Sequence, residues 1–132
     1  MLNELWRAKG LIGLVLFFVL AWAVSHRHRT KMAQSHRYTV AVIDGTHWTP
    51  KAGRNADATF TVEGRRYWTA TSAGSTQPGE LIGRRFLVKF HPPDPGMYNT
   101  LYLDAPVPGF VTDVPPKGWA SPPFTVPAGV LK

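Results

Sequence analysis

The stretch that decides the fold is residues 58–71, which read ATFTVEGRRYWTAT. Two short runs rich in β-branched and aromatic residues, 58–62 and 65–71, are separated by the pair Glu63-Gly64. A two-residue loop that ends in glycine between such runs is typical of a β-hairpin, because glycine readily adopts the positive φ that a tight turn needs. The sequence therefore predicts two antiparallel strands here.

Three further runs on either side of this hairpin have the composition and alternation of strands. They are residues 38–44, 84–91 and 100–103. In the second of them, Phe86, Val88 and Phe90 share one face, and Lys89 and His91 point the other way. No helical periodicity is present in this region. The chain is therefore expected to be mainly β, with a small five-stranded antiparallel sheet or barrel that follows one N-terminal transmembrane α-helix.

The connections between these runs are rich in turn-forming residues. Residues 46–55 contain Pro50 and Gly53, and we expect a loop there. In the segment 91–99, Pro95 and Gly96 fit the two central positions of a type II turn.

The C-terminal segment, residues 105–132, holds seven of the twelve prolines. Proline cannot donate to a strand ladder, so this segment is not a central strand. We expect a proline-rich tail that packs on the β domain through its aromatic residues. An exposed polyproline-type ligand is the alternative.

Two phrases of the sequence carry a resemblance. VEGRRY at residues 62–67 is followed by IGRRFLVKFHPPDP at residues 82–95, and LDAPVP closes the region at residues 103–108. The chain resembles small bacterial membrane proteins in which a β-rich domain of unknown function follows an N-terminal transmembrane helix. The resemblance covers roughly residues 38–108 and implies fold and membrane tethering. It implies no activity, and it departs from the members with two helices, because no second apolar span follows the domain.

Residues 11–24, LIGLVLFFVLAWAV, contain no charge. As a helix they are about 21 Å long, shorter than the roughly 30 Å bilayer core, but the apolar face extends back to Trp6. Trp6 and Trp22 lie about 24 Å apart along such a helix, which suits an aromatic belt at each interface. The predicted anchor residues are Trp6, Leu11, Phe17, Phe18 and Trp22.

A cleaved signal peptide is the alternative, because Ala21-Trp22-Ala23 has the form of a cleavage site. The β protein would then be secreted without residues 1–23. The basic cluster that follows favours an uncleaved anchor, because positive charge after the apolar core retards export. The expected divisions are an anchor at residues 1–25, a basic linker at 26–36, a β domain at 37–104 and the tail at 105–132.

The formal net charge is +7, and its densest part lies just after the apolar run. Residues 25–35 carry Arg27, Arg29 and Lys31 and no acid. This pattern is first a membrane-flank signal, and it slightly favours a cytoplasmic β domain under the positive-inside rule. We expect a single-pass protein of the cell (inner) membrane, with the side of the domain left open.

The residues offer no catalytic set. Cysteine is absent, and the chain has no nucleophile elbow, phosphate loop or dinucleotide fingerprint. We therefore expect no enzyme activity, no cofactor, no metal and no small-molecule substrate. His26 and His28 have a spacing that suits chelation with His36, but a solvated basic flank is the more ordinary interpretation, since further ligands are not evident.

Basic residues interleaved with aromatic ones form the best candidate binding surface. They are Arg65, Arg66 and Trp68 on one predicted strand and Arg84 and Arg85 on another. Such a surface is suited to anionic lipid headgroups or to single-stranded nucleic acid. Simple alternation, with arginines in solvent, is the ordinary alternative. We expect a membrane-anchored interaction module with the lipid bilayer and a protein of the cell envelope as partners. A nucleic-acid-binding barrel is the less favoured alternative.

Overall fold

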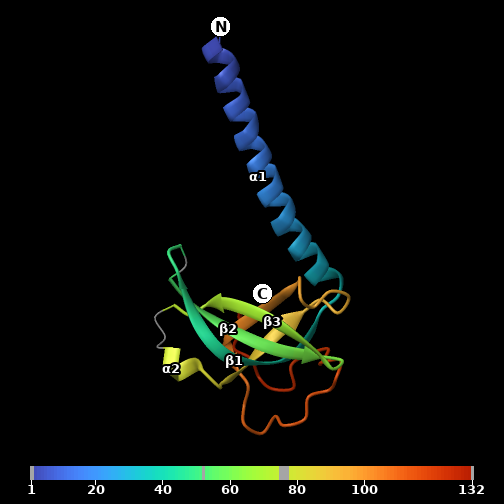
Figure 1. Ribbon diagram of the computed structural model, residues 1–132. Helices are drawn as coiled ribbons and strands as arrows, with labels where there is room; N and C mark the ends of the chain where they lie inside the picture. Colours follow the sequence, from blue (N-terminus) through green and yellow to red (C-terminus); the bar gives the residue numbers. More distant parts are fainter. Residues whose placement is uncertain (1, 52, 75–77, 132) are drawn as a thin grey trace. The chain divides into compact units, whose positions relative to one another are not determined.

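The computed structural model describes residues 2–51, 53–74 and 78–131, without the side chains of residues 2–11, 78 and 79. The chain forms two compact units, Met1–Gln34 and Ser35–Lys132. The first is the helix α1 and the second contains the sheet (Figure 1).

Helix α1 runs over Leu2–Gln34 and has 33 residues. It is longer than the apolar run, because residues 26–34, expected in a linker, contain no proline or glycine and continue the helix. Its last turns carry local contacts: the Thr30 hydroxyl donates to the His26 carbonyl (2.8 Å), and the Trp22 ring stacks on the His26 ring.

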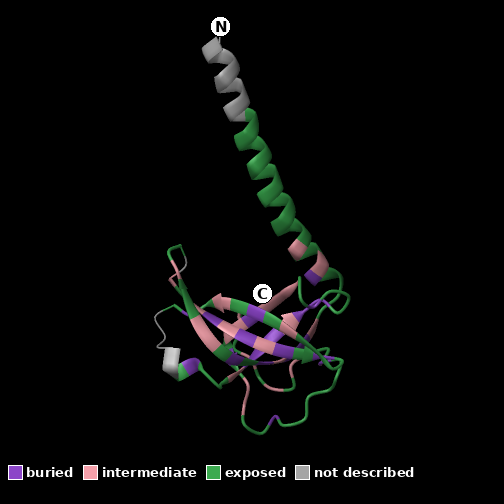
Figure 2. Cartoon of the chain, in the orientation of Figure 1, coloured by how far each residue is buried: buried purple, intermediate pink, exposed green. Residues whose placement is uncertain are grey.

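The apolar side chains between Ile12 and Val24 are exposed (Figure 2). Among the predicted anchor residues, Phe17, Phe18 and Trp22 are each more than 60 % exposed. The side chains of Trp6 and Leu11 lie outside the described part of the structure. No helix within that part combines the length and the apolarity that crossing a bilayer needs, so the transmembrane helix expected from the sequence is not found in it.

The second unit contains a five-stranded antiparallel sheet, which confirms the mainly β expectation. Its strands are β1 (Arg37–Thr49), β2 (Gly53–Val62), β3 (Arg65–Ser72), β4 (Arg85–Phe90) and β5 (Asn99–Pro106). The order across the sheet is β3-β2-β1-β4-β5, so β1 is central. The edge strands β3 and β5 also contact each other, and the sheet curls around its core (Figure 1).

The β2–β3 hairpin is the one expected from residues 58–71. Its ladder runs from Asn55↔Ser72 to Val62↔Arg65, with Glu63 and Gly64 as the turn. Both turn residues have positive φ, 51° and 81°, as a type I′ turn requires.

The β1–β2 hairpin is longer than expected, and this corrects the loop assigned to residues 46–55. A bulge between Ile43 and Gly45 shifts the register, and the ladder then continues to the pair Thr49↔Gly53. The extra residue lets the β-prone segment after Gly45 stay in the ladder, so Pro50 ends the strand instead of lying within a long loop.

Two other connections also differ from expectation. Pro78–Leu81 lies in the connection between the predicted strands 65–71 and 84–91, where no helical periodicity predicts a helix, and it forms the four-residue helix α2. Gly96 does not have the positive φ of a type II turn. The turn is closed instead by hydrogen bonds from the Asp94 amide to the His91 carbonyl and from the Tyr98 amide to the Asp94 carbonyl.

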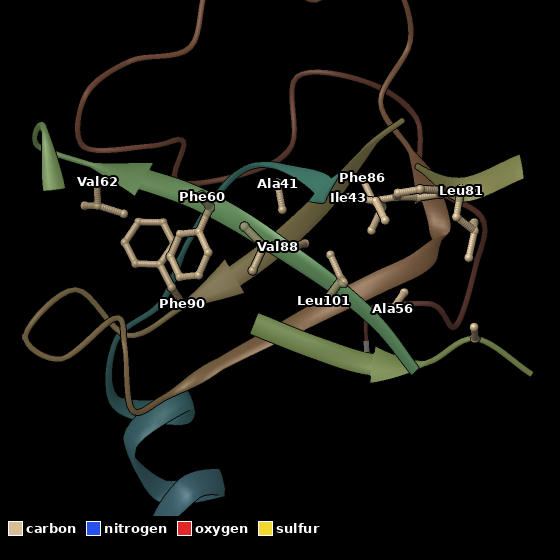
Figure 3. Packing of buried hydrophobic residues seen from close by; sticks show 12 residues of the cluster. Ala41, Ile43, Ala56, Phe60, Val62, Leu81, Phe86, Val88, Phe90 and Leu101 are labelled. Atoms are coloured by element: carbon tan, nitrogen blue, oxygen red, sulfur yellow. The ribbon is translucent and has the colours of Figure 1, made fainter. Parts of the chain in front are cut away.

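The main core lies on the inner, concave side of the sheet. Phe60, Phe86, Val88 and Phe90 are nearly or fully buried in it, and the Phe60 and Phe90 rings face each other at 6.1 Å (Figure 3). The alternation expected for Phe86, Val88 and Phe90 is thereby confirmed. We call the opposite side of the sheet the outer face.

A second apolar cluster lies on the outer face, where the C-terminal segment packs. Tyr38, Leu87 and Ala105 are buried in it, and Trp119 and Phe124 pack against them half-buried. Residues 107–131, as described, contain no helix or strand, and they cross the sheet as the orange-to-red loops of Figure 1.

Candidate functional site

Two of the five predicted binding residues lie on the outer face of β3. Phe60 pairs with Tyr67 on the inner side, so Arg66 and Trp68 project outward. Both are exposed, and Trp68 is 69 % exposed. Arg65 is exposed on the other side of the strand, opposite Val62.

The other two predicted residues are placed differently. Arg85 also faces outward, but its guanidinium is occupied, since it donates to the Val111 carbonyl (2.6 Å) and to the Pro108 carbonyl (3.0 Å). Arg84 lies over the Phe86 ring, 5.3 Å from its centroid. The structure therefore does not bring all five residues onto one surface.

The outer face beside Arg66 contains a groove of about 480 Å³. Its floor is formed by outward residues of two neighbouring strands, Val40 and Val42 from β1 and Thr59 and Thr61 from β2. Val42 is 38 % exposed, which is unusual for a large apolar side chain near the middle of a sheet. The floor is therefore an accessible strip of methyl groups and hydroxyls.

The C-terminal segment supplies the opposite wall of the groove. Val114, Pro115 and Pro116 line it, and the Glu63 amide donates to the Pro116 carbonyl at 2.7 Å. This bond ties the wall to the β2–β3 turn. The β2–β3 turn and the C-terminal segment, which bound the groove, are thus about 50 residues apart in sequence.

The segment is fastened again beyond the groove by β1. Tyr38 and Trp119 form an isolated bridge, with amide-to-carbonyl distances of 2.8 and 2.7 Å. The Arg37 guanidinium donates to the carbonyls of Lys117 and Gly118. Gly118 has φ +77°, and a Cβ at this position would lie 2.5 Å from the Tyr38 carbonyl oxygen. Glycine is therefore required for this close approach.

The charged groups at the groove are few. Arg66 and Glu63 lie on the turn side, both exposed, and the Thr59 hydroxyl lies 3.5 Å from an Asp44 carboxylate oxygen. The groove can therefore hold an extended chain with an apolar side chain on the valines and a carboxylate near Arg66.

Burial in the second apolar cluster raises the pKa of two tyrosines, which predicts alkaline destabilisation. Burial raises the pKa of Tyr38 above its ordinary value of 10.0, and it raises the pKa of Tyr102, on which Tyr38 acts further in the same direction. A group whose pKa is raised on folding favours the folded state below its unfolded pKa, and that stability is lost as pH rises through the folded value.

We therefore expect the urea midpoint of the wild type to fall as pH rises above about 10. The double variant Tyr38→Phe/Tyr102→Phe should have a shallower decline over the same range, because it lacks both ionisations. Urea titrations followed by near-UV circular dichroism check this. Parallel curves for the two proteins would contradict it.

Histidines outside the groove have structural partners. His91 is 5 % exposed, and its Nδ1–H donates to the Ser35 carbonyl at 2.9 Å. The His47 Nδ1–H donates to the Asp57 carboxylate at 2.8 Å. Within the described residues, no group of three or more His, Asp or Glu side chains is placed to hold a metal ion.

Sequence reasoning singled out Arg66 but did not predict the groove that Arg66 lines. The valines and threonines of its floor look like ordinary strand residues in the sequence. The wall of the groove comes from the C-terminal segment, whose position depends on hydrogen bonds to residues that are distant in sequence. The dipeptide Pro115-Pro116 was the only local signal, since it marks an extended segment. Comparisons of the chain with models of protein families, with curated proteins and with solved structures find no match.

Proposed function

We propose that the chain is a membrane-anchored, non-catalytic interaction module whose β domain binds an extended segment of a protein in the cell envelope. The observation that supports binding of an extended segment is the groove on the outer face, which has an accessible valine on its floor and Arg66 at its rim. Apolar strips beside a few polar groups are typical of peptide-binding surfaces.

The membrane half of the proposal rests on the uncharged run of residues 11–24 in α1 and the basic residues that follow it. The apolar side chains between Ile12 and Val24 are exposed on the helix. Such exposure is costly in water, and a bilayer removes that cost.

The groove favours a particular kind of partner. Val42 and Val114, at 38 % and 36 % exposed, offer apolar contacts to a side chain in the groove. Arg66 favours a carboxylate nearby, because a guanidinium forms charge-assisted hydrogen bonds with it. The proposed ligand is therefore an extended segment with an apolar residue close to an acidic one.

Nucleic-acid binding is not favoured by the arrangement. It would need Arg65, Arg84 and Arg85 along one track with stacked aromatics. Arg85 is occupied by backbone carbonyls. The Arg84 carbonyl accepts a hydrogen bond from the Ile43 amide. Across the two ladders, Ile43 is level with Thr69, which lies four residues along β3 from Arg65. Arg84 is therefore not beside Arg65.

The test uses a photo-crosslinking amino acid in the full chain in living bacteria. It replaces Thr61 in the groove, or, as a control, Met97 in the exposed β4–β5 connection. Membranes are washed with alkaline carbonate before blotting. We expect the chain to remain in the membrane and one discrete adduct to form from position 61 but not from position 97.

Charge reversal makes the same test specific. Arg66→Glu should lower the yield of the adduct about tenfold, which corresponds to 1.4 kcal/mol. Arg84→Glu, an equal change outside the groove, should leave the yield unchanged. A chain removed by carbonate would contradict the anchor. Equal adducts from positions 61 and 97, or an adduct insensitive to Arg66→Glu, would contradict the groove.

A further inference from the structure

The β1–β2 hairpin extends past its neighbours in the sheet. The β1–β4 ladder ends at Val42↔Arg85 and the β2–β3 ladder at Asn55↔Ser72, whereas β1 and β2 stay paired to Thr49↔Gly53. The bulge after Ile43 shifts the register where this extension begins. We call residues 46–51 and 53–56 the hairpin arm. At its base, Asn55 and Ala56 still pair with β3, and the Arg54 carbonyl accepts from the Ala73 amide.

On one side of the hairpin arm, polar side chains form hydrogen bonds with each other across β1 and β2. His47 donates to the Asp57 carboxylate at 2.8 Å, and the Asn55 amide donates to the Thr49 hydroxyl at 3.3 Å. Both contacts run diagonally across the two strands. The first contact pairs Asp57, the acid nearest to the arm, with His47. Together the two contacts hold the two strands against each other.

The other side of the arm carries a tryptophan and an arginine. Trp48 pairs directly with Arg54, so the two side chains project from the same side. Trp48 is 66 % exposed, and Arg54 and Lys51 are exposed. Residues 48–54 contain these two cations and no acid. The tip therefore combines one large amphipathic ring with two positive charges.

We propose that the tip of the hairpin arm, formed by Trp48, Lys51 and Arg54, binds anionic lipid headgroups of the membrane in which α1 is anchored. Tryptophan favours the headgroup region, because its ring is apolar while its N–H remains hydrated. Lys and Arg close to an anionic surface are attracted to it within a Debye length. The proposal rests on the proposed membrane anchoring.

Chain length and composition support lipid as the ligand. Trp48 follows the end of α1 at Gln34 by 14 residues, so it stays within about 50 Å of that point along the chain. A single tryptophan flanked by cations is suited to a planar charged surface. Single-stranded nucleic acid would call for a basic groove with several stacking rings.

Trp68 provides a matched control. It is 69 % exposed, on the same sheet, and follows the basic pair Arg65 and Arg66. General proximity to lipid would affect both tryptophans. Binding through the hairpin arm would affect Trp48 alone.

The experiment uses the full chain labelled with fluorotryptophan and reconstituted into lipid nanodiscs. Discs contain phosphatidylcholine alone or a mixture with anionic phosphatidylglycerol, each with a paramagnetic headgroup. Fluorine NMR resonances are assigned by single Trp→Phe variants, and the half-buried Trp119 reports that the domain is folded. We expect the Trp48 resonance to broaden strongly in anionic discs and to stay sharp in neutral ones, while Trp68 stays sharp in both.

Charge reversal provides the second half of the test. Lys51→Glu/Arg54→Glu should abolish the broadening of Trp48, and Arg65→Glu/Arg66→Glu should leave it intact. High salt should also remove it. Equal broadening of Trp48 and Trp68, equal broadening in neutral discs, or no broadening would overturn the proposal. So would a Trp48 response to a single-stranded oligonucleotide that exceeds the response to anionic lipid.

Failure of the anchor is distinguishable from failure of the arm. A chain that enters both kinds of disc without a change at Trp48 would support the membrane anchor and contradict lipid binding by the hairpin arm. A chain that associates only with anionic discs, with Trp48 broadened, would support lipid binding by the hairpin arm and contradict the anchor. A chain that associates with neither kind of disc would contradict both proposals.

Discussion

Replacing Phe90 by alanine is expected to lower the free energy of unfolding of the β domain by about 3–5 kcal/mol. Phe90 is fully buried, its ring faces Phe60 at 6.1 Å, and it lies within the main core (Figure 3). Truncation removes the buried ring and leaves a cavity beside rigid β-strand neighbours. Because domains of this size are stable by only about 5–15 kcal/mol, the variant should be close to unfolding at physiological temperature.

The measurement is a urea titration of the full chain in mild detergent, followed by near-UV circular dichroism. Phe110→Ala is the matched control, because Phe110 is 74 % exposed in the C-terminal segment. Its change should stay within about 0.5 kcal/mol. Similar losses in the two variants would mean that Phe90 is not part of the core as described.

The second large effect is expected for Gly118→Ala, which should cost about 2–4 kcal/mol. Alanine at φ +77° is strained by roughly 1–2 kcal/mol, and its Cβ would lie 2.5 Å from the Tyr38 carbonyl oxygen. That oxygen accepts the 2.7 Å bond from the Trp119 amide, so relief of the overlap would weaken the bridge. Each backbone hydrogen bond lost adds about 1 kcal/mol.

Gly109→Ala is the control for this prediction. Gly109 has no positive φ, and nothing lies within 4 Å of a Cβ built there. The same urea titration should show a clear loss for Gly118→Ala only. Enhanced proteolysis of residues after 106 in Gly118→Ala would show that the C-terminal segment is released. A neutral Gly118→Ala would contradict the fastening at Tyr38.

The strands were predictable where local pattern and tertiary environment agree. The β2–β3 hairpin follows from Glu63-Gly64, and the inward face of β4 follows from the alternation of Phe86, Val88 and Phe90. In these elements turn chemistry and hydrophobic period lead to the same structure.

The missed features depend on contacts that are distant in sequence or on geometry without a local signature. The bulge at Asp44 has no marker beyond the dipeptide Asp44-Gly45, which is equally typical of a turn. The local sequence therefore predicts a loop around Pro50, where the structure continues the β1–β2 ladder to Thr49↔Gly53. The basic residues after the apolar run predict a linker from residue 26, but charged residues are good helix formers, so α1 continues to Gln34.

The candidate site was predictable only in part. Sequence reasoning grouped Arg66 and Trp68 in one candidate surface, and the structure places both side chains exposed on the outer face of β3. The role of Arg85 could not be inferred, because its acceptors Pro108 and Val111 are brought to it by the path of the C-terminal segment. A composition rule cannot distinguish an arginine that binds a ligand from one that binds backbone carbonyls of its own chain.

The bridge between Tyr38 and Trp119 also has a consequence for the order in which the domain assembles. Its residues are 81 positions apart, whereas the β2–β3 hairpin closes across two. Closing a longer loop costs more entropy, so local ladders form earlier than distant ones. The C-terminal segment should therefore dock after the sheet exists. Its contacts then act chiefly as a brake on unfolding, and they contribute little to the speed of folding.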